Sequence, residues 1–150
     1  MKRTAWTILF TFAAALGAFA QSNEAMDQIL AANALQCGKA AYLLLVASDN
    51  IAEDAGDARS FDLLRELGWI GNKATAETPI TISEYAYVLM RAFGMKGGLL
   101  YSLLPGPRYA FRELVDRGVI QGRADPADRL SGQRAMHILG RVLDIEEAGG

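Results

Sequence analysis

The side chains that most often carry catalysis or bind metals are scarce in this sequence. It contains one cysteine, Cys37, and one histidine, His137, so a zinc site made of Cys and His alone would lack ligands. The acidic pair Glu53 and Asp54 is adjacent in sequence, and neighbouring side chains do not face one another across a cleft. We therefore expect a protein that is not an enzyme and that uses no metal or cofactor.

The residues best suited to binding a ligand are basic and lie in two polar stretches. Lys73 is in the first, and Arg123 and Arg129 are in the second. Because a guanidinium group matches a carboxylate with two parallel hydrogen bonds, these side chains suit an anionic polymer. The alternative is a solvated loop in which the two arginines pair with the neighbouring Asp125 and Asp128.

Trp69 and two further arginines each have a structural alternative to a binding role. Trp69 could stack against a sugar, but a Trp that follows a helix-ending glycine could equally pack its ring into the hydrophobic core. Arg91 and Arg141 recur at the expected ends of helices, where a cation complements the helix dipole. Neither arginine needs a ligand to explain it.

The first twenty residues have the three parts of a secretory signal peptide. Lys2 and Arg3 are followed by an apolar stretch and by the small-x-small end Ala18–Ala20. We expect cleavage after Ala20, export to the periplasm or cell envelope, and no transmembrane segment in the mature chain. Its charge would fall from −2 to −4 with the loss of the two cations, which argues against a nucleic-acid partner. Cys37 would then be either buried or an intermolecular pairing site.

An internal repeat becomes visible when the sequence is shifted by 50 residues. Residues 61–95 then align without a gap on residues 111–145. Each unit is predicted to be helix, loop, helix. The first helix ends at Gly68 or Gly118, and the second begins after Thr81 or Ser131. Apolar positions at three- and four-residue steps predict the buried faces: Phe61, Leu64, Leu67, Tyr85, Val88, Leu89 and Ala92, and in the second unit Tyr109, Phe111, Leu114, Val115, Ala135, Ile138, Leu139 and Val142.

A partial copy precedes the two full units. At a shift of 45, residues 40–47 lie on residues 85–92, and residues 23–34 are predicted to be helical. The fold class is therefore all-α, a small bundle of helix–loop–helix repeats. The predicted division is a signal peptide (1–20), a partial repeat (21–48), two repeats (57–95 and 108–145) and a tail (146–150), with a short helical turn at 99–104.

These residues resemble the S-layer homology domain, a repeat found in bacterial envelope proteins. The likeness rests on residues 64–71, Leu-Arg-Glu-Leu-Gly-Trp-Ile-Gly, followed by Ile-Thr-Ile-Ser-Glu at 80–84 and a late Arg91, with a second copy over 111–141. The resemblance implies a bundle of three repeats with ligand grooves between them, which binds a cell-wall polysaccharide or peptidoglycan-linked polymer. The family's motif has an arginine where this chain has Ile82 and Gly132.

A second class of function is an interaction protein of the periplasm. It would keep the helical fold and bind an envelope protein through an apolar face. The candidate residues form one apolar run between loops: Met95, Leu99, Leu100, Tyr101, Leu103 and Leu104.

Overall fold

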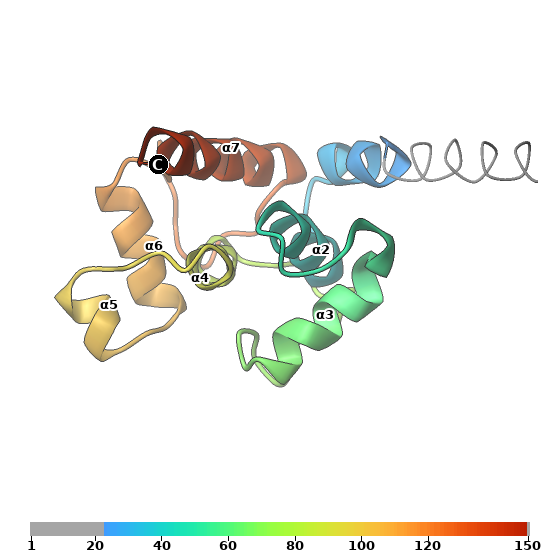
Figure 1. Ribbon diagram of the computed structural model, residues 1–150, viewed down its shortest axis with the longest axis horizontal. Coiled ribbons are helices and arrows are strands. Elements are labelled where there is room, and N and C mark those ends of the chain that lie inside the picture. Colours follow the sequence, from blue (N-terminus) through green and yellow to red (C-terminus); the bar gives the residue numbers. More distant parts are fainter. Residues whose placement is uncertain (1–22, 150) are drawn as a thin grey trace, which may run out of the picture.

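The computed structural model describes residues 23–149, and over this range the protein contains helices and no β-strand (Figure 1). A helix over residues 23–31 comes first. It is followed by α2 (Cys37–Ala47), the 3-10 helix η1 (Glu53–Ala55), α3 (Gly56–Glu66), α4 (Ile82–Ala92), α5 (Leu99–Leu103), α6 (Pro107–Asp116) and α7 (Gly132–Gly149). The predicted all-α class is confirmed. The predicted signal peptide lies outside the described residues.

Glycine ends the first helix of each full unit, as predicted. Gly68 and Gly118 have φ angles of 68° and 71°, a left-handed backbone that a side chain would strain. The following amides fold back, with Trp69 N donating to Leu64 O at 2.9 Å. This is the hydrogen bond of a Schellman motif. The chain therefore reverses into the loop at the same place in both units.

The second helices begin at the predicted caps. Thr81 and Glu84 form a complete capping box at the start of α4. At the start of α7 the Ser131 hydroxyl accepts from Arg134 N at 3.3 Å. Arg134 stands where α4 has Glu84, so it cannot complete a capping box. Its guanidinium donates to Gln121 O, also at 3.3 Å, and this hydrogen bond links the loop to α7.

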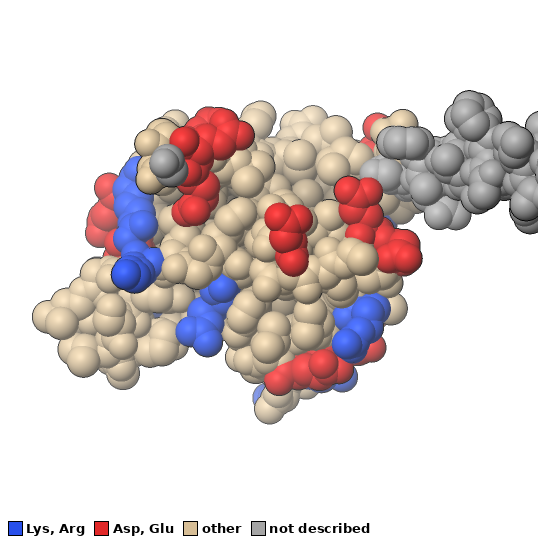
Figure 2. Space-filling model, in the orientation of Figure 1, with Lys and Arg blue, Asp and Glu red and all other residues tan. Residues whose placement is uncertain are grey.

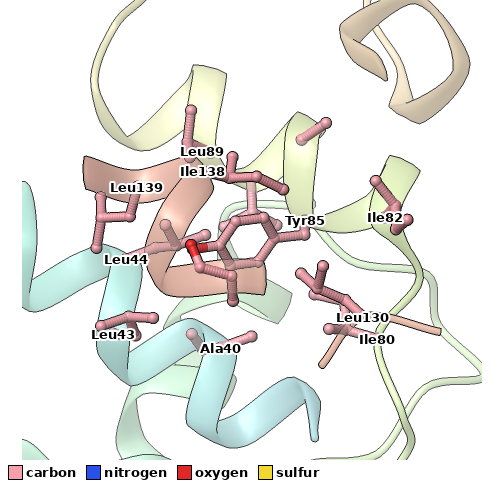
Figure 3. Close-up of a cluster of buried hydrophobic side chains, with 14 of the residues drawn as sticks. Ala40, Leu43, Leu44, Ile80, Ile82, Tyr85, Leu89, Leu130, Ile138 and Leu139 are labelled. Atoms are coloured by element: carbon pink, nitrogen blue, oxygen red, sulfur yellow. The ribbon is translucent and has the colours of Figure 1, made fainter. Parts of the chain in front are cut away.

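Tyr85 lies at the centre of the core. Figure 3 shows its ring among side chains from α2, α4 and α7, including Leu44 and Leu139. Its hydroxyl donates to Ala135 O at 3.0 Å, which satisfies a fully buried polar atom. One core thus joins the second helices of both units with α2.

Each of these three helices has a partner helix. α3 packs against α2, and α6 packs against α4. α7 meets the residues 23–31 helix, where Gly132 N donates to Ala32 O at 2.9 Å (Figure 1). The first and last helices of the described chain are therefore in contact.

Three extended residues close a ring of backbone hydrogen bonds. Leu35 N donates to Leu130 O at 2.7 Å, Leu130 N to Ile80 O at 3.1 Å, and Ile80 N to Leu35 O at 2.8 Å. All three side chains are completely buried. Each residue stands two positions before a helix, since α2, α4 and α7 begin at residues 37, 82 and 132.

Some predictions about faces and boundaries are wrong. Leu67 and Val115 are 45% and 41% exposed, because each lies near the turn that leaves its helix rather than over the core. α7 continues to Gly149. Arg141 is consequently in mid-helix and does not cap a helix end.

Candidate functional site

The position at which the S-layer homology motif has an arginine is buried in this chain. Ile82 and Gly132 stand there, as the sequence indicated, and Cys37 occupies the equivalent place two residues after Leu35. All three are buried. A cation at any of them would be desolvated without a partner, so this position cannot supply charge to a ligand.

The helix amino ends beside this ring are already bonded. Cys37 N donates to Thr78 O at 2.8 Å, and Ile82 N donates to Asp128 O at 3.0 Å. The next amide of α4, Ser83 N, donates to Pro126 O at 3.1 Å. Free amides at a helix start suit anions, but here loop carbonyls occupy them.

The same hydrogen bonds place the two polar loops beside different helices. The loop that carries Lys73 runs along the start of α2, because Ala76 O and Thr78 O accept from its first amides. The loop that carries Arg123 and Arg129 runs along the start of α4. The structure therefore places the two arginines in one loop and gives Lys73 the corresponding position in the other.

The arginines of the second loop do not form the local ion pairs that were the alternative. Asp125 and Asp128 instead accept backbone amides of their own loop, from Ala127 N at 2.8 Å and Asp125 N at 3.1 Å. Among residues 23–149, no carboxylate lies within salt-bridge distance of Arg123 or Arg129. Both residues are exposed, so their guanidinium groups are open to solvent.

A surface hollow of about 520 Å³ adjoins this loop. It lies where the starts of α4 and α6 meet Pro126 and Ala127, and Thr81 on its wall forms a backbone bridge with Arg129. Arg108 also lines it and is exposed. Arg108 was not among the predicted site residues, although Gly106 and Pro107 mark a helix start that places its side chain in the first turn.

Trp69 packs with the core. It is half-buried, and the Arg91 guanidinium lies 5.7 Å from the centroid of its ring. In the second unit Arg141 donates to Val119 O at 3.0 Å, and Val119 is the counterpart of Trp69. Both arginines therefore hold the residue that follows the helix-ending glycine, which favours the structural interpretation of Trp69 and occupies one face of its ring.

Cys37 is buried, in agreement with the first of its two predicted alternatives. Burial, with a smaller effect of the Glu84 charge, raises the pKa of its thiol to about 11. His137 is exposed on α7. Within the described range there is no group of three or more His, Cys, Asp or Glu side chains that could hold a metal ion. No helix in that range is long and apolar enough to cross a membrane.

Comparisons of this chain with family models, with curated proteins and with solved structures gave no match.

Proposed function

We propose that this protein is a non-catalytic module of the cell envelope, related in fold to S-layer homology domains, that binds an anionic wall glycan or peptidoglycan-linked polymer. The observation that carries the proposal is the ring of backbone hydrogen bonds through Leu35, Ile80 and Leu130. It supports three equivalent helix–loop–helix segments around one centre, the first of them degenerate in sequence. A surface hollow lies between two of these segments, at the start of α4.

The groove that opens beside α4 is the proposed binding site. Arg108 lines it, and the exposed Arg123 and Arg129 lie in the same loop as its lining residues Pro126 and Ala127. The one carboxylate of the lining, Glu84, is bonded to Thr81 in the capping box of α4. The three arginines replace the motif arginine, whose position is buried here. Lys73 is exposed in the loop beside α2 and would be a further contact for the polymer. Trp69 remains with the core in this proposal.

A sedimentation assay with purified cell-wall sacculi tests the proposal. Residues 21–150 should pellet with sacculi at low salt and less at high salt, because exposed charges are screened. The double variant R123A/R129A should lose binding while its melting temperature stays nearly unchanged, since exposed charges contribute only about 0–1 kcal/mol to stability.

The matched control is R59A/R112A, which removes two exposed arginines from α3 and α6 and changes the net charge equally. It should still pellet. Equal binding by wild type and R123A/R129A, or no binding by wild type, would contradict the proposed groove.

A further inference from the structure

Residues 96–108, named the leucine arm here, present an apolar surface that the core does not use. The arm contains α5 and projects from the body beside α6, at the lower left of Figure 1. Leu99, Leu100, Leu103 and Leu104 are between 56% and 76% exposed. Figure 2 shows the visible face of this projection without charged side chains. Four adjacent exposed leucines form an unusual surface for a protein in water.

Polar contacts hold the arm in this exposed position. Glu113 on α6 accepts from Gly98 N at 2.7 Å, and its other carboxylate oxygen pairs with Arg117 at 2.8 Å. The Arg117 guanidinium also donates to the carbonyl oxygen of Lys96. Tyr101 fills the inner side of the arm and is only 8% exposed. The fold therefore anchors the base of the arm and directs its leucines outward.

Charge around the leucines favours an anionic partner. Lys96 and Arg108 stand at the two ends of the arm, both are exposed, and no Asp or Glu lies between them in the sequence. Glu113 and Asp116 of α6 line the hollow beside Leu99 and Leu100, but Arg112 lines it too and Glu113 is paired with Arg117, so the cations around the arm outnumber the carboxylates. The chain as a whole is acidic, with a net charge of −2. An exposed apolar projection with cations on its flanks fits a surface that is apolar beneath an anionic layer.

We propose that the leucine arm inserts into the interface of a bilayer that contains anionic lipids. The leucine side chains would enter the boundary between head groups and acyl chains. Lys96 and Arg108 would remain at the level of the phosphates. The arm shares Arg108 with the proposed wall-polymer groove, but its leucines take no part in that groove, so L99S/L103S should leave sedimentation with sacculi unchanged.

Vesicle flotation tests the proposal with residues 21–150, which retain every residue of the core cluster. Vesicles of phosphatidylglycerol and phosphatidylcholine are compared with vesicles of phosphatidylcholine alone. The protein should float with the anionic vesicles, and L99S/L103S should weaken this binding about tenfold or more. K96Q/R108Q should lower binding and reduce its dependence on salt.

The matched control is L67S/L143S, which removes two exposed leucines from other parts of the surface. It should float like wild type. Melting curves check that each variant folds, and L100S/L104S replaces L99S/L103S if that variant melts early. Absence of wild-type flotation, or an equal loss in the control, would overturn the proposal. A dimer that L99S/L103S dissociates, without vesicle binding, would also overturn it, because the arm would then bind a second copy or another protein.

Discussion

Gly132 allows the start of α7 to pack closely against the helix over residues 23–31. A Cβ atom at this position would overlap the carbonyl oxygen of Ile29. The approach lets Gly132 N donate to Ala32 O at 2.9 Å, which joins α7 to the helix over residues 23–31. The small residue is therefore required by a close backbone crossing between distant parts of the chain.

We predict that G132A lowers the free energy of unfolding by about 1–3 kcal/mol or more, because the added methyl group must displace backbone. The matched control is G140A in the same helix, where an added Cβ meets nothing within 4 Å. Alanine should be neutral or stabilising there by up to about 1 kcal/mol. Urea unfolding followed by circular dichroism measures both. A G132A variant as stable as wild type would show that the crossing is looser than described.

Cys37 gives a prediction about pH. The pKa of its buried thiol is raised to about 11 from 9.0, so the folded state favours the protonated form. The contribution of the protonated thiol to the free energy of unfolding is fully present below about pH 9 and is lost as the pH rises towards 11. Between about pH 8 and pH 10.5, wild type should lose about 1–2 kcal/mol more than C37A. Urea unfolding of both proteins at the two pH values measures this difference. An equal loss of unfolding free energy in wild type and C37A would contradict the prediction.

Local signals in the sequence predicted some of these residues and not others. Gly68 and Gly118 could be predicted because a helix end and its following apolar residue are encoded within a few positions. The need for Gly132 could not, since the clashing atom belongs to Ile29, about a hundred residues away in the chain. The sequence also could not predict that Arg123 and Arg129 form no ion pairs with the neighbouring aspartates. That outcome depends on the loop amides, which donate hydrogen bonds to Asp125 and Asp128.

At the scale of elements, helices with strong caps were predicted well. The start of α4 follows from Thr81 and Glu84, and the short helix α5 lies within the turn expected at 99–104. The helix over residues 23–31 was the weakest prediction, because its packing partner α7 lies at the other end of the chain. Sequence periodicity identifies a helix face but not the distant element that covers it.

The contact between α5 and α6 provides a test at this scale. E113A removes the acceptor of Gly98 N and the partner of Arg117, so we expect the leucine arm to loosen. Amide exchange at Gly98 should accelerate at least about tenfold, while amides of α4 stay protected. The control E66A removes an exposed ion pair with Arg59 and should leave Gly98 unchanged. Unchanged exchange at Gly98 in E113A would contradict this, because Tyr101 and the contact of Arg117 with Lys96 would then be sufficient to hold the arm.

At the scale of the whole molecule, the shifts of 50 and 45 residues place Leu35, Ile80 and Leu130 at one position of the proposed repeat but do not predict that these residues bond to one another. In the structure three backbone hydrogen bonds join them in a ring, and all three residues are completely buried. In repeat proteins each unit buries its apolar face only against its neighbours, so closure should make residues 23–149 one cooperative unit.

Native-state hydrogen exchange at the amides of Leu35, Ile80 and Leu130 tests this closure most directly. Each amide donates within the ring, so all three should exchange only through global unfolding. Their opening free energies should then agree within about 1 kcal/mol with one another and with the stability from urea unfolding. Fast exchange at Leu35 with protection retained at Ile80 and Leu130 would contradict the account, because the amino-terminal segment would then open independently of the other two.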